Sequence, residues 1–404
     1  MKGRVFSDFG LPDRKIFPPE LVKKENLESY LEKSDEKTYY YDIFSFGNYF
    51  IIIAPPLSFD QIVYLYGHFF FKNKVDAEKY FRSHKSEVLT TEAYTRILTC
   101  LKPKIDLTNE ISSQTSRLVE ILRSNKFKNI SYTLQQNNSL TWIADWASWC
   151  VDKCGSDFVV IYDNASTEYK SSDIAKTIER KGINCFVMDV PYKYGPAWVP
   201  SNPWGSKHMW LQRACLEHIR SLCKLSSLDR EDEILVLNTD IDELLHIPKG
   251  KMNIFDVVRK YKIDVAHFMR LPVYFSKRSE NIDSISHLDH DLVKKSLNPQ
   301  APKNIFNASS LDLRSRMHQH IINSGDINAV QFIDVFASHC IGINSGWKYF
   351  TAEMKNGWVA GNSFYDYDLV NGQEVISSLV DFSDSSDNAW DIQDKLIRKE
   401  YYPD

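Results

Sequence analysis

The fold is decided by residues 233–243, which read EILVLNTDIDE. Residues 234–237 are all aliphatic, which is typical of a strand buried on both faces of a parallel sheet. The run ends in Asn238 and Thr239, and three carboxylates follow within the next four residues. In open α/β sheets, ligands gather at the carboxyl ends of the strands. This stretch therefore predicts a buried strand with a polar site at its end.

The residues on the amino-terminal side of this stretch alternate between strand and helix patterns. The predicted strands are 130–134, 158–162 and 184–190, and the predicted helices are 138–153, 172–181 and 210–222. Strands separated by helices favour a parallel sheet with right-handed crossovers. The predicted fold class is α/β, with a mixed but mainly parallel sheet flanked by helices.

The front of the chain has a different pattern. Residues 39–54 are rich in Tyr, Phe and Ile and predict strands, whereas 77–84 and 91–101 predict helices. We therefore expect an α+β accessory domain over 1–125, followed by the sheet domain over 126–345. The remainder, 346–404, is predicted to form a C-terminal lid and helical tail.

Composition limits the function classes. The 404 residues carry a formal net charge of -4, which argues against a nucleic-acid partner. The longest apolar run near the front, 49–57, is broken by two prolines and is far shorter than the roughly 20 residues of a spanning helix. Seven cysteines without regular spacing suit a reducing compartment. We expect a cytoplasmic protein without an integral membrane segment, and peripheral membrane contact stays open.

The acidic turn has the chemistry of a cation site. Asp240 and Asp242, two residues apart on a turning backbone, can bind one hard divalent cation and leave positions for phosphate oxygens. Such a cation stabilises the charge that develops on a leaving diphosphate. Lys207, at the start of a predicted helix, and Lys303 are candidates to face the phosphates. The competing interpretations are a solvated acidic turn and ordinary surface lysines.

Several short motifs come in a familiar order. These are Asp145-Trp146, residues 160–167 (VIYDNAST), a helix with Gln212, and residues 240–244 (DIDEL). Together they resemble the glycosyltransferase family 2-like and family 92 group over about residues 130 to 345. The resemblance implies a GT-A fold, which is Rossmann-like and binds nucleotide-diphospho-sugars, with a UDP-sugar donor, a manganese or magnesium ion and inversion at the anomeric carbon.

The chain also departs from that group. Asp145 replaces the usual Glu before Trp146, and Cys150 stands where a His is often found. The later "His-Tyr" of the group is His339-Cys340 here. These differences indicate a distant relative, so the identity of the donor sugar does not carry over.

The resemblance also implies roles for individual residues in nucleotide-sugar binding. Asp163, at the end of a predicted strand, would face the nucleotide base, with Thr133 and Gln135 beside the same base. The competing interpretation of Asp163 is an Asx-turn that stabilises its own loop. Ser166 and Gln212, which lie in the same motifs, complete the set.

Two further roles fall late in the chain. His339 is expected to complete the metal shell with Asp242, against the alternative of an ordinary core histidine. Inverting transfer needs a general base, for which Asp289 and Asp291 are the candidates; a charged surface loop is the alternative.

The predicted function is that of a metal-dependent glycosyltransferase with an Asp-x-Asp motif. It would move a sugar from a nucleotide sugar to a glycan, glycolipid or other hydroxyl acceptor, in polysaccharide or glycan biosynthesis. A sugar nucleotidyltransferase is an alternative, although no Gly-rich, Lys-containing loop that would cradle a triphosphate is visible. The same acidic and histidine residues are also compatible with a non-catalytic sugar- or metal-binding protein and with a two-metal hydrolase.

Overall fold

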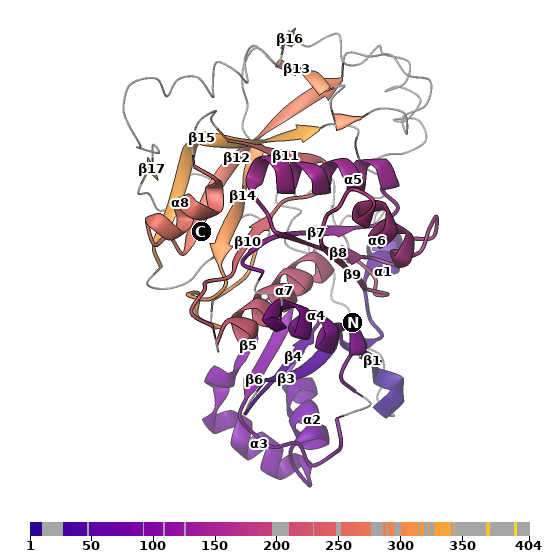
Figure 1. Ribbon diagram of the computed structural model, residues 1–404. Helices are drawn as coiled ribbons and strands as arrows, with labels where there is room; N and C mark the ends of the chain where they lie inside the picture. Colours follow the sequence, from indigo (N-terminus) through magenta and orange to yellow (C-terminus); the bar gives the residue numbers. More distant parts are fainter. Residues whose placement is uncertain are drawn as a thin grey trace. The chain divides into compact units, whose positions relative to one another are not determined.

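The chain forms two compact units. One unit comprises Met1–Asn125 and Met188–Ser226, and the other comprises Lys126–Val187 and Ser227–Asp404 (Figure 1). Residues 188–226, which we assigned to the sheet domain, therefore cluster with the front of the chain. The structure, a computed structural model, describes residues 1–9, 27–46, 48–91, 93–107, 110–124, 127–195, 210–228, 230–247, 252–275, 286–287, 290–294, 300–313, 315–318, 322, 327–340, 343, 369–371 and 392–393.

The first unit is built on a small antiparallel sheet. Its order is β3-β4-β6-β5, and a separate two-stranded sheet pairs β1 with β2. The elements are β1 (Arg4–Val5), α1 (Leu27–Lys33), β2 (Thr38–Tyr40), β3 (Asp42–Phe46), β4 (Tyr49–Ala54), α2 (Phe59–Phe69), α3 (Lys74–Ser83), β5 (Val88–Thr90), β6 (Thr95–Thr99), α4 (Ser113–Ser124) and α7 (Trp210–Ser227), with short 3-10 turns at Phe6–Phe9 and Lys85–Glu87.

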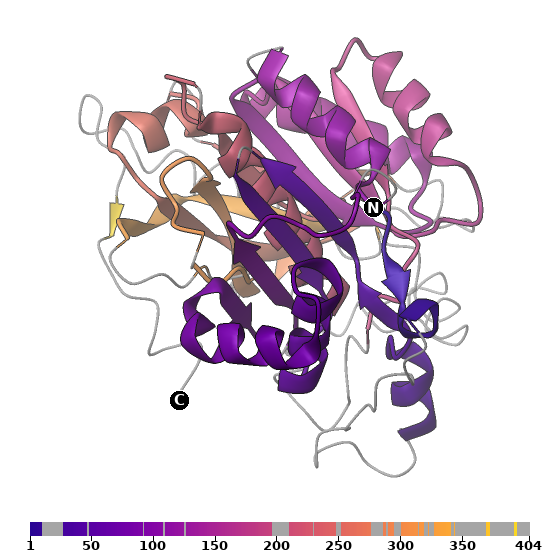
Figure 2. The ribbon, with the colours of Figure 1, turned by 90° about the horizontal axis from the view of Figure 1, so that it is seen from below.

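Helices cover both faces of the four-stranded sheet. On one face, Ile52 and Ile97 share an apolar core with Tyr66 of α2 and Phe81 of α3, and Figure 2 shows both helices lying across the sheet. α7 covers the opposite face. There, Arg96 of β6 forms a buried ion pair with Glu217 of α7, and the next α7 residue, His218, is hydrogen-bonded to Asp42 of β3. The return of the chain at 210–227 therefore completes this unit.

One predicted helix of this unit is wrong. Residues 91–101 contain strand β6, which pairs with β4 and β5. Thr95, Ile97 and Thr99 are β-branched and alternate along the segment, which suits a central strand better than a helix. The predicted strands over 39–54 and the predicted helix over 77–84 are confirmed in β2 to β4 and α3.

The second unit contains the larger sheet. Its elements are β7 (Asn129–Gln135), α5 (Leu140–Trp149), a π-helical turn (Cys150–Cys154), β8 (Phe158–Asp163), α6 (Ser171–Glu179), β9 (Cys185–Asp189), β10 (Leu235–Asn238), β11 (Glu243–His246), α8 (Ile254–Lys260), β12 (Val265–Phe275), β13 (His290–Lys294), β14 (Gln300–Asn307), β15 (Ala329–Cys340), β16 (Leu369–Asn371) and β17 (Ile392–Gln393). The strands and helices predicted between 130 and 190 are confirmed.

The sheet is mixed, with the order β11-β15-β12-β14-β10-β7-β8-β9 along its main path. β10, β7 and β8 are parallel neighbours, as predicted. Beyond β10, the pairs β10–β14, β14–β12 and β15–β11 are antiparallel, and only β12–β15 is parallel. Six of the nine strand pairs whose direction is described in this sheet are antiparallel, so the prediction of a mainly parallel sheet is wrong among the described strands.

Helices α5, α6 and α8 cover one face of this sheet. Leu237 of β10, Ser131 of β7 and Val159 of β8 are register partners and so share that face. Val159 packs in the core of α5 and α6, and Leu237 packs in the core of α8. Across the described parts of both units, no helix is long and apolar enough to cross a membrane. Of the predicted C-terminal lid and tail, the described residues beyond 346 are those of β16 and β17.

Candidate functional site

The acidic turn connects the end of β10 to the start of β11. The amide of Glu243 donates to the Asp240 carbonyl over 3.0 Å, and the amide of Asp240 donates to the Glu243 carboxylate over 2.8 Å. This reciprocal pair closes the turn. Asp240, Asp242 and Glu243 then each present a carboxylate oxygen within 4.8 Å of the other two. Such a set of hard oxygen donors fits a small divalent cation.

Neighbouring elements hold the turn at three points, one at the side chain of Thr239 just before it and two at its backbone. The indole N–H of buried Trp146, on α5, donates to Thr239 Oγ1 over 3.1 Å. Nε2 of buried His287 donates to the Ile241 carbonyl over 2.7 Å. The amide of Cys340 donates to the Asp242 carbonyl over 2.7 Å. The turn is thus bound on several sides before any ligand arrives.

Two cations face the same carboxylates, Lys303 with a fully buried side chain and Arg270 with a side chain that is 12% exposed. Lys303 Nζ, on β14, lies 2.8 Å from Asp240 Oδ2 and 3.4 Å from Glu243 Oε2. Arg270 Nη1, on β12, lies 2.7 Å from Glu243 Oε1. Burial by itself lowers the pKa of Arg270, but the carboxylates of Glu243, Asp240 and Asp242 outweigh it, and the net shift is upward. Both basic groups are positioned to neutralise the acidic turn.

Glu243 is fully engaged by these contacts. Its Oε1 receives Arg270, and its Oε2 receives the Asp240 amide and Lys303. Its side chain is completely buried. The carboxylates that remain to hold a cation are therefore Asp240, which is partly exposed, and Asp242.

His339 lies beside this pair. β11 and β15 are antiparallel, and Glu243 is directly opposite His339 in their register. His339 Nε2 is 3.2 Å from Asp242 Oδ2, and its side chain is 21% exposed, so the ring can be reached from solvent. The residue lies inside β15, one position before its end. Its role as a third metal ligand stays a prediction, and the geometry brings it to the predicted neighbour.

The ends of β7 and β8 form a second polar group. Gln135 and Asp163 are register partners, and the Gln135 side-chain amide donates to the Asp163 carboxylate. The hydroxyl and the amide of Ser166 also donate to Asp163. Ala165 between them has a φ of 51°, in the left-handed region. Asp163 therefore stabilises its own loop, through the amide three residues on rather than the two of an Asx-turn, and contact with a nucleotide base stays a prediction.

These two groups share an edge of the sheet. β7, β8 and β10 are parallel, so their carboxyl ends point the same way. Thr133 of β7 is buried on the face that α5 covers, and its hydroxyl has no hydrogen-bond partner among the described residues. It lies two residues before Gln135, as the prediction requires. Thr133, Gln135, Asp163 and Ser166 are thus brought to the same strand ends.

Other predicted residues are not placed with this group. Gln212 lies on α7 in the first unit, where its side-chain oxygen accepts from the Tyr194 hydroxyl over 2.9 Å. Lys207 and Asp289 lie outside the described residues. Asp291 lies in β13, whose backbone alone is described at that position. The candidate general bases are therefore untested.

Arg270 and His287 are functional candidates that our sequence analysis missed. Arg270 is a single charge within the apolar segment VAHFMRLPVYF, a pattern that signals a buried cation in need of an acid. His287 precedes the two candidate bases in the sequence, and no pattern around it indicated a functional role. The register that brings both side chains to the turn depends on strands far apart in sequence.

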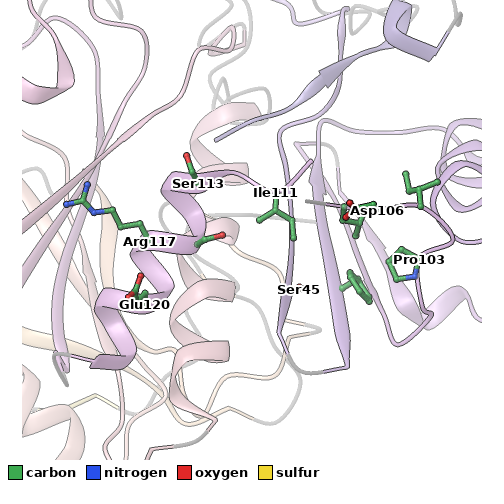
Figure 3. Close-up of a pocket in the computed structure, with 11 residues that line it drawn as sticks. Ser45, Pro103, Asp106, Ile111, Ser113, Arg117 and Glu120 are labelled. Atoms are coloured by element: carbon green, nitrogen blue, oxygen red, sulfur yellow. The ribbon is translucent and has the colours of Figure 1, made fainter. Parts of the chain in front are cut away.

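A surface pocket of about 810 Å³ is present in the first unit (Figure 3). Its lining includes Ser45 of β3, Pro103 and Asp106 of the loop after β6, and Arg117 and Glu120 of α4. None of the predicted site residues lines it. The pocket is shallow and chemically mixed, so the acidic turn remains the candidate site.

Comparison with known proteins does not assign the chain to a family. No protein-family model matches the chain, and no curated protein matches it. A solved structure of S. aureus TarS 1-349 in complex with UDP is 16% identical, with 45% of this chain and 47% of that chain covered and a TM-score of 0.24. The chain thus spans about half the length of that structure.

A second similar structure is described as a "Putative Glucose-1-Phosphate Thymidylyltransferase" from Bacillus anthracis in complex with a sucrose. It is 8% identical, with 44% of this chain and 72% of that chain covered and a TM-score of 0.24. Both likenesses are too weak to define the fold or the function. The resemblance to the family 2-like and family 92 glycosyltransferases therefore rests on the quoted motifs alone.

Proposed function

We propose that this protein is a metal-dependent glycosyltransferase that takes its sugar from a nucleotide-sugar donor, with a UDP-sugar as the first candidate. One observation carries the proposal. The carboxylates of Asp240 and Asp242 gather at the carboxyl edge of a parallel strand, within reach of a buried lysine, a partly exposed arginine and a histidine. A cation site beside basic groups suits a ligand that is itself a chelating anion, as a diphosphate is.

Each group has a role in this proposal. Asp240, Asp242 and His339 hold Mn²⁺ or Mg²⁺, which when bound neutralises the charge on the leaving diphosphate. Lys303 and Arg270 add positive charge on the protein side of the same anion. Glu243 pairs with both of them.

The strand ends of β7 and β8 serve the nucleoside. Gln135 and Ser166 hold the Asp163 carboxylate in one orientation, where an oxygen can accept an N–H from a base such as uracil. Thr133 lies two residues before Gln135 on β7. The carboxylate is thus oriented before the ligand binds, which reduces the entropy lost on binding.

The acceptor and the base belong to the same proposal. A hydroxyl of a glycan or glycolipid would attack with inversion, and Asp291 or Asp289 would take its proton. β13, which contains Asp291, pairs with the end of β12. Assembly of a polysaccharide or glycan is the process that such a reaction would serve.

A second candidate is a metal- or sugar-binding protein without turnover. The observation that favours it is the ion pair of Lys303 with Asp240, which already neutralises half of the carboxylate pair. A turn stabilised in this way needs no metal. The two candidates differ in whether the protein binds a nucleotide together with a divalent cation.

Calorimetry with UDP tests the proposal, with GDP and CDP as controls, in Mn²⁺ and then in excess chelator. We expect UDP to bind only with the metal and to lose at least about tenfold in affinity in Asp242→Asn. Asp152→Asn, at an exposed aspartate of the same unit, should bind as the natural protein does. Absence of nucleotide binding in both conditions would overturn the proposal and favour the second candidate.

A further inference from the structure

Lys303 is an uncommon residue for its surroundings. Its side chain is fully buried on β14, where the neighbouring Ile305 on the same face packs in the core of α8. Its ammonium lies 2.8 Å from Asp240 Oδ2 and 3.4 Å from Glu243 Oε2. A buried lysine keeps its charge only where carboxylates compensate it. These two carboxylates supply that compensation.

The position of the ammonium overlaps with that of a bound cation. Asp240 and Glu243 are two of the three residues whose oxygens converge within 4.8 Å. A divalent ion on Asp240 would share a carboxylate with the ammonium, at a separation where two cations repel strongly in a poorly solvated site. Metal and ammonium therefore compete for Asp240.

Charge balance strengthens this competition. The three carboxylates of the turn face two cations, Lys303 and Arg270, which leave one net negative charge. Arg270 cannot leave easily, because its guanidinium also donates to the Ala301 carbonyl over 2.5 Å. Lys303 is the cation that can move, since an ammonium on a four-carbon stem can rotate toward another anion.

We propose that Lys303 is a built-in counter-cation that makes metal binding at Asp240 and Asp242 conditional on the diphosphate. This inference rests on the proposed function. Without nucleotide, the ammonium neutralises Asp240 and weakens binding of the ion. A diphosphate offers the ammonium a new anionic partner, so Asp240 is released to the metal. Lys303 is thus a positioning residue that couples the two ligands, and the coupling must be reciprocal.

The experiment measures Mn²⁺ affinity, by electron paramagnetic resonance of unbound Mn²⁺, without and with saturating UDP. The variants are Lys303→Met, which removes the charge at similar length, and Lys303→Gln, which keeps hydrogen-bond donors for Asp240 and Glu243. Lys176→Met, at a lysine 64% exposed on α6 in the same unit, controls for the lost charge. Thermal unfolding checks that each variant is folded; if Lys303→Met is not, Lys303→Gln carries the test.

For the natural protein and Lys176→Met, we expect weak Mn²⁺ binding that UDP strengthens. Removing the Lys303 charge should tighten Mn²⁺ binding without nucleotide by about tenfold or more, and should reduce the strengthening by UDP about as much. Unchanged or weaker metal binding in both Lys303 variants would overturn the inference while leaving the proposed function intact. A natural protein that binds neither Mn²⁺ nor UDP would overturn both.

Discussion

Glu243 holds the acidic turn in place through three contacts of its carboxylate. Its buried carboxylate receives the Arg270 guanidinium, the Lys303 ammonium and the Asp240 amide. Removing one partner of a buried ion pair leaves the others uncompensated in a poorly solvated site, which costs far more than the pair contributes. The residue is therefore structural for the turn even though it belongs to the acidic cluster.

We expect Glu243→Gln to lower the free energy of unfolding by about 3 kcal/mol or more, because two buried cations lose their shared anion. Urea unfolding followed by circular dichroism measures the change. Glu179→Gln, at an exposed residue of α6, is the matched control and should remain within about 0.5 kcal/mol of the natural protein. A loss below about 1 kcal/mol in Glu243→Gln would show that the pairs contribute little.

At this scale, the sequence could predict the acids but not their partners. An Asp-x-Asp at the end of an aliphatic strand is a local pattern, so Asp240 and Asp242 were accessible to analysis. Lys303 and Arg270 reach them through the β10–β14 and β14–β12 pairings, which are antiparallel and join segments more than 25 residues apart. No local periodicity encodes such a register.

At the scale of elements, the π-helical turn and α8 lie in close contact at Gly155. Gly155 ends the turn with a φ of 83°. A Cβ on it would collide with the side chain of Asn253, which caps α8 by accepting from the Phe255 amide over 2.8 Å. Gly155 thus combines two constraints, a left-handed backbone and close approach to a helix cap.

Gly182 has the first of these constraints without the second. Its φ is 76°, and a Cβ there would meet nothing within 4 Å. We expect Gly182→Ala to cost about 1 kcal/mol, the strain of a left-handed alanine, and Gly155→Ala to cost about 3 kcal/mol because the cap of α8 is displaced as well. Chemical unfolding of both variants measures the difference. Equal losses would mean that Asn253 moves aside without cost.

The elements also show where sequence patterns are informative. The helix with Trp146 and the strand 158–162 were predicted correctly, because a polar cap or an aliphatic run marks each one. The helix predicted over 91–101 was wrong, since Thr and Ile at alternate positions gain more from a central strand. The antiparallel half of the large sheet was missed because its strands mix buried charges with apolar residues.

At the scale of the whole molecule, buried histidines make stability depend on pH. Burial lowers the pKa of His267, on β12, to about 4, and lowers that of His246, on β11, equally. The unfolded chain, with a histidine pKa near 6.5, therefore takes up protons before the folded protein does. Each histidine's contribution is complete above about pH 6.5 and declines as the pH falls toward 4.

We predict that His267 alone makes the protein about 2 kcal/mol less stable at pH 5 than at pH 7. Urea unfolding at the two pH values, with the natural protein and His267→Gln, isolates this share from that of the other titrating groups. The variant should lose less stability on acidification by that amount. Parallel behaviour of the two proteins would show that His267 is solvated or remains uncharged in the unfolded chain.

The assignment of α7 to one of the two units could not be predicted from the order of the segments in the sequence. The pattern of α7 is that of an amphipathic helix, and nothing in it states which sheet the helix covers. Its buried Glu217 and His218 meet Arg96 and Asp42 from more than 120 residues earlier. These pairs assign α7 to the first unit, although the helix lies between strands of the second in the sequence.

This interrupted arrangement has a consequence for biosynthesis. On a ribosome, the first 125 residues emerge before α7, whose Glu217 and His218 contact Arg96 and Asp42. The nascent chain must therefore wait for about a hundred further residues, including β7, β8 and β9, before its first unit is complete. We therefore expect the boundary that matters for folding during synthesis to lie after residue 227 rather than after residue 125. Binding of chaperones, pauses at rare codons and the points at which the gene can be divided should reflect that boundary.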